Sequence, residues 1–142
     1  MRTSKNLMIV VDDDADDRML CQEYLGRLAN GGHELVMLSS GEELFQYLDN
    51  IAREDELPRL VLMDYNMPRM TGGEILLQLR KQARYASLKV ALYSSGMSPE
   101  LQQCMVALQA AHCFNKPVSV DEFTQMSAVL RSIMYPESIH VA

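Results

Sequence analysis

Leu60-Val61-Leu62-Met63-Asp64 is the stretch that decides the fold, because an apolar run of strand length leads directly into a carboxylate. Other short apolar runs also lead into acid, hydroxyl or ammonium side chains: residues 7–11 before Asp12 and Asp13, residues 90–93 before Ser94, and the segment around Phe114 before Lys116. If these runs are parallel strands, their carboxyl ends meet at one edge of a sheet, where open α/β sheets bind ligands. We therefore expect the functional site at that edge.

Segments with helical periodicity alternate with the apolar runs, a pattern typical of a doubly wound α/β fold. Several begin with a hydroxyl residue followed three positions later by glutamate, which is the spacing of a capping box. The pairs are Ser40 with Glu43, Thr71 with Glu74 and Ser119 with Glu122, while Ser98 precedes a proline suited to a first helical turn. A further helix is expected within the acidic residues after Asp13. The sequence thus predicts five parallel strands and five helices in three αβα layers.

Length and composition are those of one globular domain. The chain has 142 residues, 48% of them hydrophobic and 23% charged, with no repeat and no Gly/Ser/Pro linker. We expect a single domain over residues 1–142, with a core at about 6–134 and a short C-terminal tail at 135–142. The polar connection at residues 50–59 is expected to be a surface loop.

Charge and hydropathy exclude several classes of function. No apolar stretch reaches the roughly 20 residues needed to span a bilayer, and the N-terminus lacks a signal-peptide pattern, so we expect a cytoplasmic protein without a membrane partner. The net charge of -6 and the absence of clustered Lys and Arg argue against DNA as a partner.

The cysteines and histidines give no sign of a site. Cys21, Cys104 and Cys113 lack the close spacing of a metal or redox motif, so we expect small buried apolar side chains in a reducing compartment. The histidines are equally scattered, and we expect neither a ligand nor a phosphate-donor role for them: His33, His112 and His140.

Four motifs together resemble the receiver domains of two-component response regulators. They are Val10-Val11-Asp12-Asp13, Met63-Asp64-Tyr65-Asn66-Met67-Pro68-Arg69-Met70-Thr71-Gly72, Tyr93-Ser94-Ser95-Gly96 and Asn115-Lys116-Pro117. They occur in the family's order, with 30 residues from Asp64 to Ser94 and 52 from Asp64 to Lys116. The resemblance covers nearly the whole chain and is to the stand-alone, chemotaxis-regulator type. It implies a flavodoxin-like fold with strand order 2-1-3-4-5.

The resemblance also implies the chemistry of the site. Asp64 would accept a phosphoryl group from the phosphohistidine of a sensor histidine kinase or of a histidine phosphotransfer protein. Lys116 would neutralise charge on the transferred group, and the hydroxyl of Ser94 would donate to one of its oxygens.

A cluster of acids at this edge requires a compensating cation. Two carboxylates about 4 Å apart repel by about 4 kcal/mol at an effective dielectric constant near 20. Mg²⁺ suits such a cluster because it prefers hard oxygen ligands, with Mn²⁺ as the alternative ion. By resemblance Asp13 and Asp64 bind it directly, Asp12 acts through water, and the backbone carbonyl of Asn66 is a further ligand. No other cofactor is expected.

The acids that follow are assigned to the helix instead. Asp14, Asp16 and Asp17 suit the positive end of the first helix, and we expect no metal role for them.

Receivers couple phosphorylation to a surface change through the hydroxyl at the position of Ser94 and an aromatic residue three positions before the lysine. That position is Cys113 here, and Phe114 beside it should face the opposite side of its strand. The switch candidates are therefore Ser94, Cys113 and Phe114, with Tyr93 as a further one. The family likeness also implies a cis Lys116-Pro117 bond, which costs only about 0.5–1 kcal/mol.

The sequence is interpreted as a stand-alone response regulator that signals by phosphorylation-dependent binding. Its output would be docking, through the fourth helix and fifth strand, to a downstream target protein or to a second copy of the chain as a homodimer. It would phosphorylate and dephosphorylate itself without being an enzyme that turns over small molecules. Two alternatives stay open: a phosphorelay shuttle to a histidine phosphotransfer protein, and a phosphorylation-independent interaction module. A haloacid-dehalogenase-type phosphatase is disfavoured, because it needs a second acid where Asn66 stands.

Overall fold

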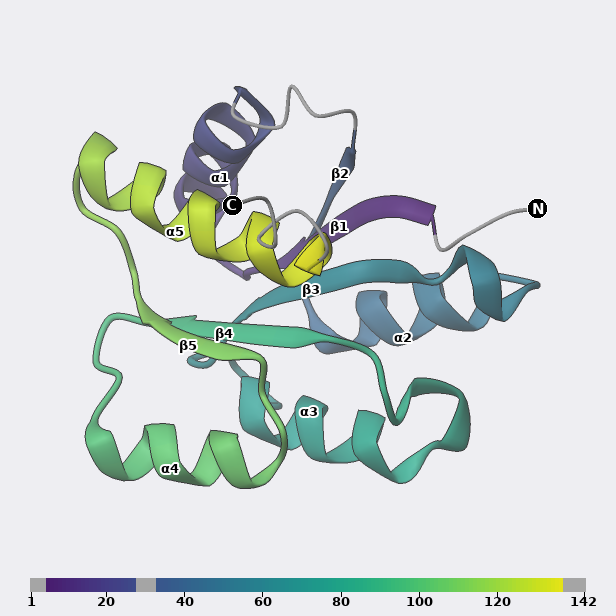
Figure 1. Ribbon diagram of the computed structural model, residues 1–142. Coiled ribbons are helices and arrows are strands. Elements are labelled where there is room, and N and C mark those ends of the chain that lie inside the picture. Colours follow the sequence, from purple (N-terminus) through teal and green to yellow (C-terminus); the bar gives the residue numbers. More distant parts are fainter. Residues whose placement is uncertain (1–4, 28–32, 137–142) are drawn as a thin grey trace.

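The computed structural model describes residues 5–27 and 33–136, in which strands and helices alternate along the chain (Figure 1). The strands of this part of the chain are β1 (Lys5–Val11), β2 (Glu34–Leu38), β3 (Pro58–Asp64), β4 (Val90–Ser94) and β5 (His112–Asn115). All pair in parallel in the order β2-β1-β3-β4-β5, so the predicted doubly wound, flavodoxin-like sheet is confirmed.

Helices cover both faces of this sheet. They are α1 (Ala15–Arg27), α2 (Gly41–Asp49), α3 (Gly72–Lys81), α4 (Pro99–Ala107) and α5 (Val120–Met134). Figure 1 shows α1 and α5 on one side and α2, α3 and α4 on the other, which is the expected αβα layering. No helix among the described residues is both long and apolar enough to cross a membrane.

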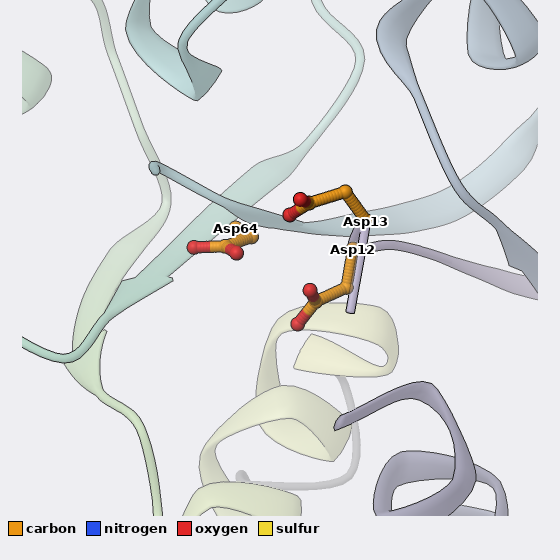
Figure 2. A group of neighbouring side chains, drawn as sticks. All are labelled: Asp12, Asp13 and Asp64. Atoms are coloured by element: carbon orange, nitrogen blue, oxygen red, sulfur yellow. The ribbon is translucent and has the colours of Figure 1, made fainter. Parts of the chain in front are cut away.

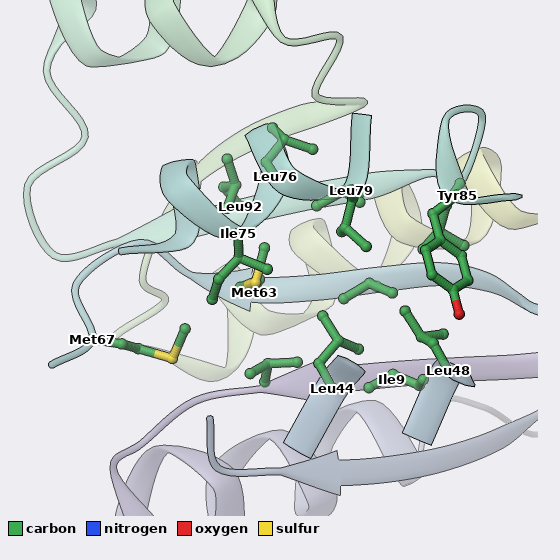
Figure 3. Close-up of a cluster of buried hydrophobic side chains, with 14 of the residues drawn as sticks. Ile9, Leu44, Leu48, Met63, Met67, Ile75, Leu76, Leu79, Tyr85 and Leu92 are labelled. Carbon is green, nitrogen blue, oxygen red and sulfur yellow. The ribbon is translucent and has the colours of Figure 1, made fainter. Parts of the chain in front are cut away.

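Side chains of the strands alternate between two cores, because successive residues of a strand point to opposite faces. Ile9 and Met63 pack with α2 and α3 in the core drawn in Figure 3, beside Leu44 and Ile75. Their neighbours in β1 and β3 pack instead with α1 and α5. The same alternation places Asp12, just after β1, and Asp64, the last residue of β3, toward the α1/α5 side, in step with Val10 and Leu62.

The helices begin where the capping-box spacing predicts, but two of them differ from the predicted capping box in one hydrogen bond. Thr71 and Glu74 form a complete capping box at α3. At α2 and α5 the hydroxyl caps the helix as expected, but the glutamate carboxylate reaches one residue further back. Glu43 accepts from the amide of Ser39 at 2.7 Å, and Glu122 accepts from the amide of Val118 at 2.8 Å. The spacing of hydroxyl residue and glutamate therefore predicted each helix start. Which backbone amide the glutamate carboxylate bonds depends on the path of the chain just before the helix.

Two smaller expectations need correction. The connection at residues 50–59 is not a loop throughout, since it holds a 3-10 turn at Glu54–Glu56 and the beginning of β3. Cys21 is buried and Cys113 half-buried, as expected, but Cys104 is exposed because only Met105 of α4 is buried in the core. Most of the predicted tail, with His140, lies outside the described residues.

Candidate functional site

The carboxyl ends of the strands bring the predicted acids together. Asp12 and Asp13 follow β1, Asp64 ends β3, and the register pairs Val11 with Met63 and Asp64 with Tyr93. One carboxylate oxygen from each of the three acids lies within 4.8 Å of the others. Figure 2 shows the three side chains gathered close together at the strand ends. Asp12 and Asp64 are buried, whereas Asp13 is exposed.

Asp12 is held by donors on nearly every side. Its Oδ2 accepts from the hydroxyl of Tyr93 at 2.5 Å and lies 3.2 Å from the ammonium of Lys116. Its Oδ1 accepts from the amide of Asp14 at 3.0 Å, and its backbone carbonyl accepts from Arg18 at 2.7 Å. The contacts of Oδ1 and Oδ2 compensate a carboxylate that has no exposed surface.

Asp64 has fewer donors than its burial requires. Its Oδ1 accepts from the amide of Asn66 at 3.0 Å, and its Oδ2 accepts from Lys116 at 3.1 Å. Burial is the largest influence on this carboxyl group and the charge of Asp12 the next, and together they raise its pKa to about 6 against the opposing effect of the two donors. A cation in the acid cluster would therefore favour the ionised form of Asp64.

Lys116 lies between the acids. Its Nζ is 3.1 Å from Asp64, 3.2 Å from Asp12 and 2.6 Å from Asp17. Burial alone would lower the pKa of this ammonium, but the hydrogen bond to Asp17 and the charges of Asp12 and Asp64 outweigh it and raise the pKa. Lys116 therefore stays charged and opposes the negative potential of the cluster.

The peptide bond that follows Lys116 is trans, as is every other peptide bond in the described part of the chain. The prediction of a cis peptide bond between Lys116 and Pro117 is therefore wrong. The ammonium nevertheless reaches the acids, since the backbone amide of Lys116 donates to the carbonyl of Ser94 at 2.9 Å and fixes the end of β5 beside β4.

Ser94 is fully buried at the end of β4, and its hydroxyl oxygen accepts two hydrogen bonds. Nδ2 of Asn66 donates to it at 2.8 Å and the amide of Gly96 donates at 3.1 Å. The hydroxyl proton of Ser94 is left to donate elsewhere. Ser94 and Asn66 thus link the end of β4 to the loop after Asp64.

The two switch candidates on β5 have side chains on opposite faces of that strand, as predicted. Cys113 packs against the core below α3 and α4, while Phe114 packs against the α1/α5 core. The ring of Phe114 also lies 4.4 Å from the ring of His112, measured between centroids. Cys113 therefore occupies the side on which the family's aromatic residue was expected.

Asp17 is a site contact that the sequence did not predict. It was assigned to the first turn of α1, where Asp14 caps the helix by accepting from the amides of Asp16 at 2.8 Å and Asp17 at 3.1 Å. The side chain of Asp17 also pairs with Lys116, 99 positions away. No local pattern signals this pair, because it depends on where the fold places the first turn of α1 relative to the residue that follows β5.

The donor set of the cluster fits a hard divalent cation. All three acids offer carboxylate oxygens. Mg²⁺ and Mn²⁺ prefer such hard oxygen ligands, whereas softer metals prefer sulfur or imidazole ligands. The carboxylate of Asp13 accepts no hydrogen bond from any residue that the structure describes, so both of its oxygens are available. The strand ends therefore form an acidic pocket with one ammonium at its side.

This fold and this pocket define the receiver class of signalling proteins. Residues 8–128 match the family model of the response regulator receiver domain, and the chain belongs to that family. Receiver domains are the phosphoacceptors of two-component systems rather than small-molecule metabolic enzymes, and phosphorylation and Mg²⁺ binding at an acidic pocket are typical of them.

Several known proteins similar to the chain are response regulators. It is 27% identical over 130 residues to the two-component response regulator ARR15 of Arabidopsis thaliana, covering 87% of this chain and 61% of that protein. It thus spans about three fifths of the length of that relative. The crystal structure of the phosphorylated cyanobacterial phytochrome response regulator RcpA has a TM-score of 0.77, with 22% identity and coverage of 94% of this chain and 96% of that one. The Mn²⁺-bound form of response regulator Rcp1 has a TM-score of 0.73 at 21% identity, covering 89% and 91%.

Proposed function

We propose that Asp64 accepts a phosphoryl group from a phosphohistidine and that the modified chain signals by binding another protein. The observation that carries this proposal is the position of Asp64, which is buried, lies in a group of three acids and bonds the ammonium of Lys116 at 3.1 Å. The donor would be a sensor histidine kinase or a histidine phosphotransfer protein.

The transfer is a displacement at phosphorus. A carboxylate oxygen of Asp64 forms the new O–P bond, the P–N bond to the donor imidazole breaks, and its electron pair stays on that nitrogen. Asp64 must be ionised to attack. Lys116 would balance negative charge on one side of the phosphoryl group. Its ammonium contacts both Asp17 and Oδ2 of Asp64, so it lies beside the carboxylate that would attack phosphorus.

Asp13 and Asp64 are the residues proposed to hold Mg²⁺, or Mn²⁺, directly, with the backbone carbonyl of Asn66 and with Asp12 acting through water. The bound cation would supply positive charge to the phosphoryl oxygens. Asp13 suits a direct role because its carboxylate is exposed and unbonded within the described residues, whereas Asp12 is buried and already bonded.

Exposed apolar side chains beside the pocket support docking of the phosphodonor protein. Met19 and Leu20 on α1 are 68% and 42% exposed, and Val118 before α5 and Val120 at its first position are 86% and 57% exposed. Leu20, Val118 and Val120 line a hollow of about 210 Å³ between these segments. Burial of such side chains would hold a partner's histidine beside Asp64.

The output is proposed to begin at Ser94. A phosphoryl group on Asp64 can accept a hydrogen bond from the hydroxyl of Ser94, whose oxygen now accepts from Asn66, and drawing Ser94 toward Asp64 would move the loop before α4. Along the β5 edge of the sheet, Val106 of α4 is 60% exposed on one face, and a hollow of about 360 Å³ lies between β5 and α5 on the other face. A downstream protein or a second copy of the chain would bind there.

The proposal is tested by incubating the protein with acetyl phosphate and Mg²⁺ and measuring its intact mass. We expect one added phosphoryl group on the wild type, none on Asp64→Asn, and wild-type behaviour for Asp49→Asn, whose carboxylate lies far from the pocket against Tyr85. Absence of an adduct on the wild type would favour a phosphorylation-independent module. Rapid transfer of the group to a histidine phosphotransfer protein would identify a shuttle.

A further inference from the structure

Tyr93 is a buried tyrosine whose hydroxyl lies inside the acid cluster. Only 1% of its surface is exposed, and the hydroxyl donates to Oδ2 of Asp12 at 2.5 Å. The sulfur of Cys21 lies 3.4 Å from the same hydroxyl. A tyrosine is protonated at neutral pH, so in the contact with Asp12 it is the donor and the carboxylate the acceptor.

Strand alternation explains why Tyr93 reaches this position. Its side chain joins the α1/α5 core, the side toward which Asp12 also points, whereas Ser94 next to it points the other way. Its ring centroid lies 5.0 Å from the ammonium of Lys116. Tyr93 thus contacts the anion and the cation of the pocket without facing solvent.

The bonds to Asp12 leave it little capacity to bind a metal. A carboxylate has about four lone-pair positions, two on each oxygen. On Oδ2 one is taken by Tyr93 and the other by Lys116. On Oδ1 one is taken by the amide of Asp14. A single position on Oδ1 remains for a cation or for a water bound to it.

We propose that Tyr93 is a positioning residue of the cation site: its hydroxyl holds Oδ2 of Asp12 away from a divalent cation and so makes the site weaker than the three acids alone would make it. The inference rests on the proposed metal site. The ligand concerned is Mg²⁺ or Mn²⁺, and the residue acts on it through Asp12 rather than by contact.

Removing the hydroxyl strengthens cation binding for two reasons. Oδ2 regains a lone pair that can face the cation. A buried carboxylate that loses a donor is also less well compensated in the empty site, so a cation stabilises it more. A purely structural tyrosine would give the opposite result, because loosening the pocket weakens binding.

The experiment is a calorimetric Mg²⁺ titration of wild type, Tyr93→Phe and Tyr85→Phe. Tyr85 is the matched control: it is also 1% exposed and donates to an aspartate, Asp49, at 2.5 Å, but it lies at the other end of the sheet. We expect Tyr93→Phe to lower the Mg²⁺ dissociation constant by roughly threefold to tenfold. Tyr85→Phe should leave it unchanged.

A double substitution tests the route through Asp12. In an Asp12→Asn background, Tyr93→Phe should no longer tighten Mg²⁺ binding, because the anionic acceptor is gone. Unchanged or weaker binding by Tyr93→Phe, while the wild type binds Mg²⁺ and Asp13→Asn does not, would overturn the inference and leave the proposed metal site standing. A wild type that binds no Mg²⁺ would remove both.

A measurement on the wild type covers the case in which Tyr93→Phe fails to fold. The ring carbon that bears the hydroxyl of Tyr93 can be followed by NMR in protein labelled at that atom. We expect its signal to show a hydrogen-bonded, protonated hydroxyl both without and with saturating Mg²⁺. Loss of that hydrogen bond on adding Mg²⁺ would contradict the proposal, since Tyr93 would then have released Asp12.

Discussion

Burial of the Asp64 carboxylate, which places it for its proposed reaction, lowers the free energy of unfolding. Its carboxylate is buried beside Asp12, and burial first and this neighbour second raise its pKa to about 6. The donors Asn66 and Lys116 compensate only in part. The ionised side chain is therefore less stable in the folded protein than in the unfolded chain, where the pKa is near 3.9.

Asp64→Asn should stabilise the metal-free protein, and the gain should depend on pH. The folded pKa is raised, so the ionised carboxylate destabilises the fold above about pH 6, and this cost disappears as the pH falls from about 6 toward about 4. We expect the substitution to raise the free energy of unfolding by about 2 kcal/mol at about pH 8 in EDTA, and by much less at about pH 4.5. Urea unfolding at both pH values measures this.

Magnesium provides the control for that comparison. At saturating Mg²⁺ the wild type should gain stability by binding the ion and the Asp64→Asn protein should gain less, so the difference between them should shrink or reverse. A destabilising effect of Asp64→Asn at about pH 8 in EDTA would contradict the account of this residue.

The sequence predicted the acids and the lysine because each follows an apolar run, but it did not predict the partners that complete the pocket. Lys116 meets Asp17 across 99 positions, and Tyr93 meets Asp12 across 81. The first contact depends on where the fold places the start of α1 relative to the end of β5, and the second on which face of β4 a side chain occupies. Neither leaves a local pattern in the chain.

Among the structural elements, the junction between β3 and α3 holds the loop that follows Asp64. The amide of Gly72 donates to the carbonyl of Tyr65 at 2.8 Å, and Thr71 caps the helix. A Cβ on Gly72 would lie 2.7 Å from the carbonyl oxygen of Asp64 and 2.9 Å from Leu92. The helix can thus begin this close to the strand only with glycine at its first position.

Gly72→Ala should therefore destabilise the protein by about 1–3 kcal/mol, because the backbone of β3 cannot move away from the added methyl group. Gly96→Ala is the matched control, since a Cβ there meets nothing within 4 Å. Thermal or urea unfolding of the two variants measures the difference. Equal stability of both would show that the junction is looser than the structure indicates.

Helix and strand positions were the part of the fold best predicted by sequence. Apolar periodicity and N-capping hydroxyls located the helices, because both are local properties. Two details were not predicted. The amide bonded by Glu43 or Glu122 depends on the path of the chain just before each helix, and the exposure of Cys104 depends on how α4 lies on the sheet. The strand order also came from the family resemblance rather than from periodicity.

At the scale of the whole molecule, Arg80 ties α3 to the end of α4. Its guanidinium donates to the carbonyls of Leu108 at 2.9 Å and Gln109 at 3.1 Å, just beyond α4. It also donates to Leu88 at 2.8 Å, before β4. One side chain thus connects three segments on the side of the sheet where the output surface is proposed.

Arg80→Ala should cost about 2 kcal/mol or more in the free energy of unfolding, since several carbonyls lose a charged donor at once. Arg80→Lys should recover only a minor part, because an ammonium cannot span the same carbonyls. Arg69→Ala is the control: the Arg69–Glu42 pair has side chains 81% and 67% exposed, so the change should be small. Similar decreases in the free energy of unfolding for Arg80→Ala and Arg69→Ala, measured in urea, would show that the Arg80 hydrogen bonds do not stabilise the connection between these segments.

We propose that the phosphoryl group is carried by Asp64 and by no other residue. The most direct measurement is to treat the acetyl-phosphate-modified protein with sodium borohydride, which reduces an aspartyl phosphate to homoserine, and to sequence its peptides by mass spectrometry. We expect homoserine at position 64 alone, formed only when Mg²⁺ was present. Homoserine at position 12 or 13, or stable phosphate on a serine or histidine with position 64 unchanged, would contradict it.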